Sequence, residues 1–157
     1  MSGVSLRAIG DGDLDALFEQ MRDPEAVRMA AFTHQDPDDR ELFDAQMARI
    51  GADPGTTNRV IIRDGQVAGM VASFQQGGET EVTYWVDRSL WGQGVATEAL
   101  RLLLEEVTAR PISARAASDN LGSLRVLEKA GFRIIGTNRD FAQARNAEIE
   151  ETIFRLD

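Results

Sequence analysis

Two alternating apolar segments joined by an Asp-Gly turn constrain the fold of this chain more than any other feature. Asn58–Arg63 and Gln66–Phe74 each have the pattern of a β-strand, and Asp64-Gly65 lies between them. A two-residue loop of this composition joins antiparallel strands, because both of its positions favour positive φ values. A third strand is expected at Glu81–Val86, after the Gly77-Gly78 turn. The middle of the chain is therefore predicted to form an antiparallel meander.

Helical periodicity flanks this meander on both sides. The expected elements outside it are a strand at Val4–Ile9, helices at Leu14–Met21, Glu25–Ala30 and from Pro37 to near Gly51, a helix at Val95–Ala109, a strand at Pro111–Ala116, a helix at Asn120–Ala130, and a closing antiparallel pair at Phe132–Thr137 and Ile149–Leu156. A polar loop joins the last two strands. This order indicates an α/β (α+β) fold with a mixed, mostly antiparallel sheet, and we expect one domain over residues 1–157.

Composition excludes several classes of function. The chain has no cysteine, and His34 is its single histidine, so thiolate and multi-histidine metal sites are excluded and no metal is expected. Lys and Arg number 17 against 26 Asp and Glu, a net charge of −9, which does not suit a nucleic-acid partner. No apolar run reaches the ~18 residues of a membrane span, and the first residues lack a signal peptide's apolar core. We expect a cytoplasmic protein with no membrane partner.

The segment over residues 91–100, Trp-Gly-Gln-Gly-Val-Ala-Thr-Glu-Ala-Leu, follows a predicted strand and opens a predicted helix. Gly92 and Gly94 let the backbone approach a ligand with no side chain in between. The first N–H groups of the helix have no helical partner, and the helix dipole adds positive potential there. Thr97 adds a hydroxyl. A pyrophosphate suits such a site, although glycines also make ordinary turns.

A second segment, residues 118–136, predicts a strand exit, a helix and a sharp Gly-Phe return into a strand. Asn120 is a good residue to begin a helix, with Ser123 three positions later. Gly131 suits the position just after the helix, and Phe132 suits the core. Taken alone, these residues favour capping and packing over a binding role.

Together the two segments resemble the GNAT superfamily of acetyl-coenzyme A-dependent N-acetyltransferases. The pattern Q/R-x-x-G-x-G/A is represented by residues 91–96, and N-x-x-S…E-K-x-G-F by Asn120, Ser123 and residues 128–132. The run Y-W-V-D…W-G-Q-G-x-A-T-E-A-L is similar to the Rim-type branch, which acetylates N-terminal amines of ribosomal proteins. The resemblance covers nearly the whole chain and implies a GNAT fold, with about seven strands and about four helices.

The resemblance also implies an activity, in which a primary amine attacks acetyl-coenzyme A directly in a ternary complex. The residues implied in coenzyme A binding are Val86, Trp91, Gly92, Gln93, Gly94, Val95, Ala96, Thr97, Asn120 and Ser123. Those implied at the acceptor are Phe32, His34 and Tyr84. The expected acceptor is a protein N-terminal α-amine or a small-molecule amine, and a homodimer is among the expected assemblies.

Two departures from the family pattern affect the mechanism. Trp91 stands where the family usually has Arg or Gln, so the pyrophosphate would depend on backbone N–H groups. Leu127 stands where many relatives have a tyrosine that protonates the leaving thiolate. Ser123 is the substitute candidate for that role. An acyl-coenzyme A-binding sensor or scaffold without catalysis is the alternative function.

The reaction also needs a base and an oxyanion donor. A backbone N–H of the strand Glu81–Val86 is the expected donor to the oxyanion. The base candidates are Glu81, Asp140, Glu150 and a water chain. Relatives present a carboxylate near the place of Glu81, and a solvent-facing strand residue is the alternative interpretation.

The acceptor site has weaker signals. His34 lies in a loop where the family receives acceptors, and an ordinary loop residue is the alternative. Tyr84 and Trp85 are expected to line the core and the cofactor site rather than to catalyse. The loop acids Asp36, Asp38 and Asp39 would create a field that attracts a cationic amine.

Overall fold

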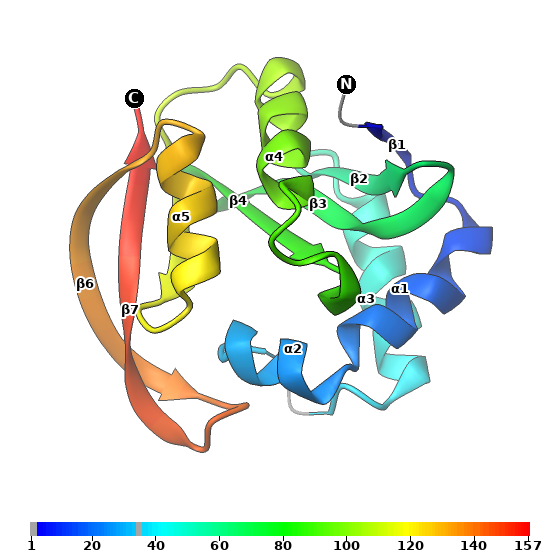
Figure 1. The fold of residues 1–157 in the computed structure, drawn as a ribbon, viewed down its shortest axis with the longest axis horizontal. Helices are drawn as coiled ribbons and strands as arrows, with labels where there is room; N and C mark the ends of the chain where they lie inside the picture. The colour runs from blue at the N-terminus through cyan, green and yellow to red at the C-terminus, as the bar shows by residue number, and fades with distance from the viewer. Residues whose placement is uncertain (1–2, 34–35) are drawn as a thin grey trace.

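The computed structural model describes residues 3–33 and 36–157, and these residues form a seven-stranded sheet (Figure 1). The strands are β1 Val4–Ala8, β2 Thr57–Arg63, β3 Gln66–Gln76, β4 Glu79–Val86, β5 Ile112–Ala117, β6 Arg133–Ala142 and β7 Ala147–Leu156. Their spatial order is β1-β2-β3-β4-β5-β7-β6. Within the described part, β4 and β5 pair in parallel and every other neighbouring pair is antiparallel. The predicted mixed, mostly antiparallel sheet is confirmed.

Five α-helices occur among the described residues. They are α1 Leu14–Met21, α2 Pro24–Ala30, α3 Arg40–Ala52, α4 Val95–Glu106 and α5 Leu121–Lys129, with short 3-10 turns at Asp11–Asp13 and Arg88–Leu90. Asp23 begins α2 and Asp39 begins α3, since their carboxylates each accept a backbone N–H bond of 3.0 Å. None of these described helices is long and apolar enough to cross a membrane.

Apolar clusters on opposite faces of the sheet hold the helices in place. Val60 and Ile61 are consecutive residues of β2, so their side chains point to opposite faces, and they belong to different clusters. Helices α4 and α5 pack on the face of Ile61, whereas α1 and α3 pack on the face of Val60. Figure 1 shows α4 and α5 in front of the sheet and α3 behind it.

The last hairpin is longer than the sequence predicts. The pairing of β6 with β7 continues from Arg133 opposite Arg155 to Ala142 opposite Ala147. Most of the segment expected to be a polar loop is therefore strand, and the turn covers only residues 143–146. Because β6 is an edge strand with mostly exposed side chains, polar residues can occupy positions 137–140, and the apolar alternation that would predict a strand is missing there.

The predicted helix that begins at Val95 is shorter than expected. It ends at Glu106 rather than at Ala109, since Val107 has extended backbone angles, with φ −103° and ψ 102°. The other predicted helices and strands agree with the structure within a few residues at their ends.

Gly69 provides a test of how closely β3 and β4 approach. Its φ is +152°, and a Cβ at this position would overlap the backbone carbonyl of Trp85. We expect Gly69→Ala to lower the free energy of unfolding by about 1–3 kcal/mol, because neither backbone can move without disturbing the sheet. Gly136→Ala is the control, since nothing lies within 4 Å of its Cβ position. Equal denaturation midpoints for the two variants would contradict the prediction.

Candidate active site between diverging strands

The candidate site lies where β4 and β5 separate. The two strands pair only at Thr80 with Ile112 and at Glu81 with Ser113. Beyond these pairs β4 continues to Val86 and β5 to Ala117. A cavity of about 620 Å³ opens along this separation, lined by both strands, by the starts of α4 and α5, and by α2 with the residues that follow it.

The start of α4 leaves backbone donors free at one end of the cavity. Gly94 precedes the helix in the left-handed conformation, with φ +79°, and Gly92 has φ +78°. The first bond of the helix runs from the N–H of Glu98 to the carbonyl of Gly94, at 3.1 Å. The N–H groups of residues 95–97 therefore have no partner within the helix. They can hold an anion with the support of the helix dipole.

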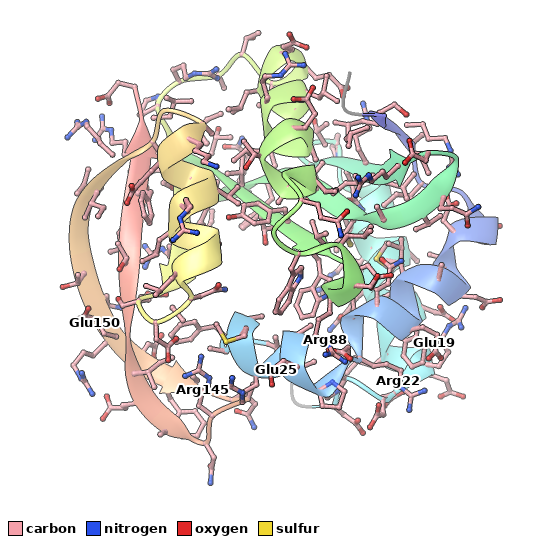
Figure 2. All side chains as sticks on the ribbon, viewed as in Figure 1. Glu19, Arg22, Glu25, Arg88, Arg145 and Glu150 are labelled. Carbon is pink, nitrogen blue, oxygen red and sulfur yellow. The ribbon has the colours of Figure 1, made fainter. Side chains whose placement is uncertain are left out.

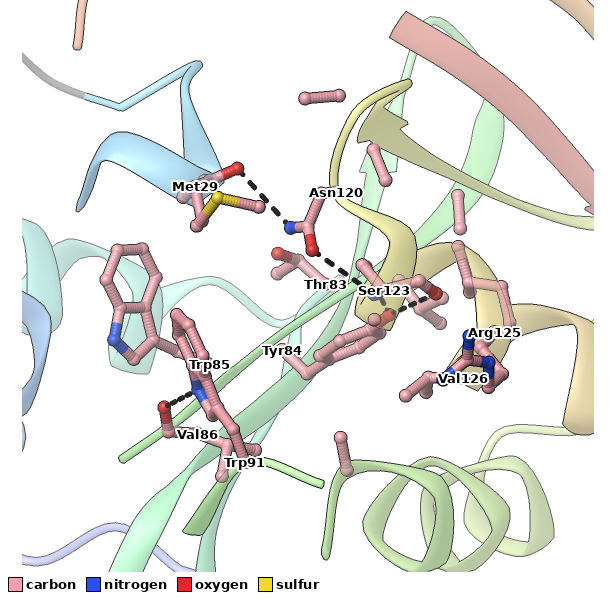
Figure 3. A pocket seen from close by; sticks show the side chains of 18 of the residues that line it. Met29, Thr83, Tyr84, Trp85, Val86, Trp91, Asn120, Ser123, Arg125 and Val126 are labelled. Carbon is pink, nitrogen blue, oxygen red and sulfur yellow. Dashed lines mark hydrogen bonds between the residues drawn. The ribbon is translucent and has the colours of Figure 1, made fainter. Parts of the chain in front are cut away.

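Most of the residues implied in coenzyme A binding line this cavity. They are Val86, Trp91, Gly92, Gly94, Val95, Ala96, Thr97, Asn120 and Ser123. Gln93 does not line it, and its side-chain oxygen instead accepts a hydrogen bond from Arg63. The Trp91 indole donates to the carbonyl of Val86 at 2.9 Å (Figure 3). Because this bond occupies the indole N–H, Trp91 offers an anion no side-chain donor.

Asn120 and Ser123 lie at the start of α5, as the sequence predicts. The Asn120 side-chain oxygen accepts the N–H of Ser123 at 3.3 Å, and its amide donates to the carbonyl of Met29 at 3.3 Å. The Ser123 hydroxyl lies 2.6 Å from the Tyr84 hydroxyl, and the Ser123 carbonyl oxygen, at 3.2 Å, is a second acceptor within reach of the one Tyr84 hydrogen (Figure 3). Burial raises the pKa of Tyr84 to about 12, and the hydrogen bond with Ser123 opposes this shift.

Glu81 lies on the opposite face of β4 from Tyr84, because successive side chains of a strand alternate. It is 8 % exposed, so its alternative interpretation as a solvent-facing residue is wrong. Its carboxylate lies 3.3 Å from the guanidinium of Arg115, which also bonds to Glu151 at 3.0 Å. Burial raises the pKa of Glu81, Arg115 opposes this shift, and the negative charge of Glu151 adds to it.

Sequence reasoning misses Arg115 and Glu151. Both line the cavity, and Glu151 is 6 % exposed. They come from β5 and β7, which are neighbours in the sheet although far apart in the chain. No local motif marks either residue, so only the strand order and register could have indicated them.

The other base candidates lie away from the cavity. Asp140 and Glu150 are exposed on the last hairpin, and neither lines the cavity. Figure 2 shows Glu150 at the outer edge of the molecule. Among the side chains predicted as the base, all of them described in the structure, only Glu81 lines the cavity.

The expected acceptor residues have different outcomes. Phe32 and Tyr84 line the cavity, whereas His34 lies outside the described residues. The acids of the neighbouring loop do not line it. The carboxylate of Asp38 pairs with Arg22 at 2.8 Å, that of Asp39 caps α3, and that of Asp36 accepts the N–H of Asp38. These acids have structural partners, so the expected field from the loop finds no support in the geometry.

Helix α2 covers one side of the cavity and is tethered at both ends. At its start, Asp23 pairs with Arg88 at 2.8 Å. At its end, the Arg145 guanidinium donates to the carbonyl of Arg28 at 2.6 Å and pairs with Asp119 at 2.8 Å. Figure 2 shows Arg145 of the last hairpin beside this helix. The side of the cavity that α2 covers is therefore built from segments distant in the chain.

Comparison with known proteins agrees with this geometry. The model of the acetyltransferase (GNAT) domain matches residues 4–133. The chain therefore belongs to the GNAT family, and its class of activity is N-acetyl transfer.

A curated relative, the uncharacterized N-acetyltransferase p20 of Bacillus licheniformis, is 25 % identical over 98 % of this chain and 92 % of its own length. The ribosomal-protein-alanine N-acetyltransferase of Brucella melitensis has a similar structure, with a TM-score of 0.81 and 23 % identity over 97 % of this chain and 98 % of that one. The spermidine N-acetyltransferase of Vibrio cholerae, in complex with CoA and spermine, has a TM-score of 0.82 and 14 % identity over 99 % and 96 %. Both likenesses show the GNAT fold.

The buried charges of the site give a pH-dependent prediction. Arg115→Gln removes the cation that opposes the raised pKa of Glu81, so that pKa rises further. A carboxyl with a raised folded-state pKa loses its stabilising contribution as pH rises. We expect the variant to lose about 1–2 kcal/mol of unfolding free energy at pH 8 and less at pH 5, since Arg115 is half-exposed and water screens part of the loss.

Arg101→Gln is the matched control, because Arg101 also bridges two glutamates, Glu98 and Glu105, on the exposed side of α4. We expect it to change stability by less than about 0.5 kcal/mol at either pH. Urea denaturation at both pH values checks the pair. A loss for Arg115→Gln that does not depend on pH would show that the guanidinium is not coupled to the buried carboxylates.

Proposed function

We propose that this chain binds acetyl-coenzyme A and transfers its acetyl group to a primary amine, which attacks the thioester directly. One observation carries the proposal: a single cavity contains the free N–H groups at the start of α4 and the buried carboxylate of Glu81. The first suits a pyrophosphate, and the second suits a base for an amine. They lie on different sides of the separated strands, so the two substrates can meet in the gap between them.

In the proposed reaction the pyrophosphate accepts bonds from the N–H groups of residues 95–97. Backbone groups of β4 beyond Glu81 are not paired to β5, so they can bond the pantetheine arm and the oxyanion. The ammonium form of the acceptor first gives one proton to solvent. The neutral amine then attacks the thioester and loses its second proton to Glu81, directly or through water. Ser123 lies on the face where the thiolate would depart.

The binding of the pyrophosphate is tested at Gly94. We expect Gly94→Asp to weaken calorimetric binding of coenzyme A more than tenfold, about 1.4 kcal/mol, because it adds a negative charge beside the free N–H groups. Gly94→Asn has nearly the same shape without the charge, so it should weaken binding less. Gly77→Asp is the control, since Gly77 also has positive φ but lies outside the cavity. Unchanged affinity in folded Gly94→Asp would refute the assignment.

The role of Glu81 is tested by the pH profile. Because the base must be deprotonated, kcat/KM should rise with pH through the raised pKa of Glu81. We expect Glu81→Gln to remove this step and to lower kcat/KM on the order of 10²-fold. Glu79→Gln on the same strand is exposed and outside the cavity, so it should leave the profile unchanged. If kcat/KM of Glu81→Gln still rises with pH over the same range, another group is the base.

The proposed acceptor is a cationic primary amine, an α-amine first and a small polyamine second. The protein carries a net charge of −9, and two buried carboxylates on the strand side of the cavity, Glu81 and Glu151, share the guanidinium of Arg115. The other two described cations that line the cavity, Arg125 and Lys129, lie on α5, away from this pair of carboxylates. The named activities of the two structural relatives are consistent with either acceptor. An α-amine has a pKa near ~8, against ~10.4 for a lysine amine, so it needs less help from a base.

A panel of N-terminal peptides, polyamines and lysine side-chain analogues, assayed by release of the coenzyme A thiol, tests this assignment. For the best acceptor we expect kcat/KM to fall as salt is added, since screening limits the field to about 8 Å at physiological ionic strength. A neutral or anionic best acceptor with no salt effect would contradict it. Tight acetyl-coenzyme A binding without turnover on any amine would instead favour a sensor or scaffold.

A further inference from the structure

Tyr84 is the only tyrosine of the chain, and its hydroxyl is buried against Ser123. The two hydroxyl oxygens lie 2.6 Å apart, and both residues line the cavity (Figure 3). Tyr84 comes from β4, and Ser123 from the first turn of α5. Their contact therefore joins the two elements between which the thioester would lie in the proposed function.

The contact is held from both sides. Tyr84 packs against the apolar cluster under α4 and α5, so its ring has little freedom. Ser123 is placed by Asn120, whose side-chain oxygen accepts its N–H. The raised pKa of Tyr84, about 12, keeps its hydroxyl protonated at neutral pH. Tyr84 thus keeps one hydrogen to donate, and of the two Ser123 acceptors within its reach the hydroxyl oxygen, at 2.6 Å, is nearer than the carbonyl oxygen, at 3.2 Å.

A serine hydroxyl has one hydrogen to donate and can accept two hydrogen bonds. When the Ser123 oxygen accepts from Tyr84, its own hydrogen is left for another acceptor. The open side of Ser123 is the cavity. Leu127, at the family's usual tyrosine position, has no hydroxyl to offer, so the hydroxyls at this point of the cavity are those of Tyr84 and Ser123. With the Tyr84 hydrogen directed to Ser123, the hydrogen left for the cavity is that of Ser123.

We propose that Tyr84 is a positioning residue for the leaving thiolate: it donates to the Ser123 oxygen and thereby directs the Ser123 hydrogen to the sulfur. This inference rests on the proposed function. In the step, the amine nitrogen bonds to the carbonyl carbon, and the carbon–sulfur bond then breaks with its electron pair on sulfur. The proton of the amine leaves toward Glu81 or water. Neither hydroxyl ionises, because both are far weaker acids than the thiol, and the thiolate is stabilised by the hydrogen bond.

The first test needs neither an acceptor nor a variant. A hydrogen bond to the charged form lowers a pKa, so the thiol of bound coenzyme A should titrate below the ordinary thiol value of about 8.5. The pH dependence of coenzyme A affinity, measured against acetyl-coenzyme A, which has no free thiol, gives this pKa. We expect thiolate to bind about tenfold more tightly than thiol, one pKa unit. A bound pKa at or above the free value would overturn the inference.

The variants then separate positioning from simple packing. Tyr84→Phe keeps the ring and removes the hydroxyl, and Ser123→Ala removes the second hydroxyl. We expect both to return the bound thiol pKa to its free value and to lower kcat about tenfold, with little change in KM for acetyl-coenzyme A. The double variant should be no slower than Ser123→Ala alone, because the two residues act in series.

Thr152→Val is the matched control. It breaks a similar hydroxyl pair, Ser118 with Thr152 at 2.7 Å, which lies outside the cavity, so it should leave the thiol pKa and kcat unchanged. Wild-type values in Tyr84→Phe, or additive losses in the double variant, would overturn the role of Tyr84. A wild-type protein that lowers the thiol pKa but acetylates no amine would refute the proposed function, and the role in thiolate departure with it. A protein that acetylates amines without lowering the thiol pKa would overturn this inference alone.

Discussion

The separation of β4 from β5 after the pair Glu81–Ser113 is the feature on which the rest of the site depends. A fully paired sheet would leave no space between these strands and no free backbone groups on their facing edges. Here the second half of β4 keeps its pairing with β3, so it is rigid on one side and open on the other. A rigid edge that β5 does not pair suits the binding of an extended amide chain, since backbone groups need partners when they are removed from water.

The side chains proposed to act on the amine and on the thiolate lie on opposite faces of a single strand, β4. Glu81 and Tyr84 differ by an odd number of positions in β4, so they point to opposite faces of the sheet. A base and a thiolate-stabilising donor on the same face would face each other without a substrate between them. With the gap beside β4, an amine and a thioester can approach each other from opposite faces. In the proposed reaction, the strand would therefore keep the sites of the two substrates apart and let the reacting atoms meet.

Burial gives the charged and hydroxyl groups of the site their properties. Glu81 keeps a raised pKa because it is withdrawn from water, and Arg115 limits that shift without cancelling it. The same effect on Tyr84 keeps its hydroxyl as a donor. By contrast, the acids of the loop before α3 remain near solvent and satisfy Arg22 or the helix start. The density of acids in the sequence therefore indicated the loop as the source of a field for a cationic amine. The structure instead places a buried pair of acids, Glu81 and Glu151, on the strands.

The sequence by itself determined what depends on neighbours in the chain. The hairpin at Asp64-Gly65, the helix start at Gly94 and the cap at Asn120 follow from backbone preferences over a few residues, and the family motifs are built on these same positions. Only the tertiary structure decided the placement of β7 between β5 and β6, which brings Glu151 to Arg115. It also brought Tyr84 to Ser123. The reason is physical: strand order and register are selected by the burial of whole faces of the sheet, an energy summed over distant segments that no local pattern records.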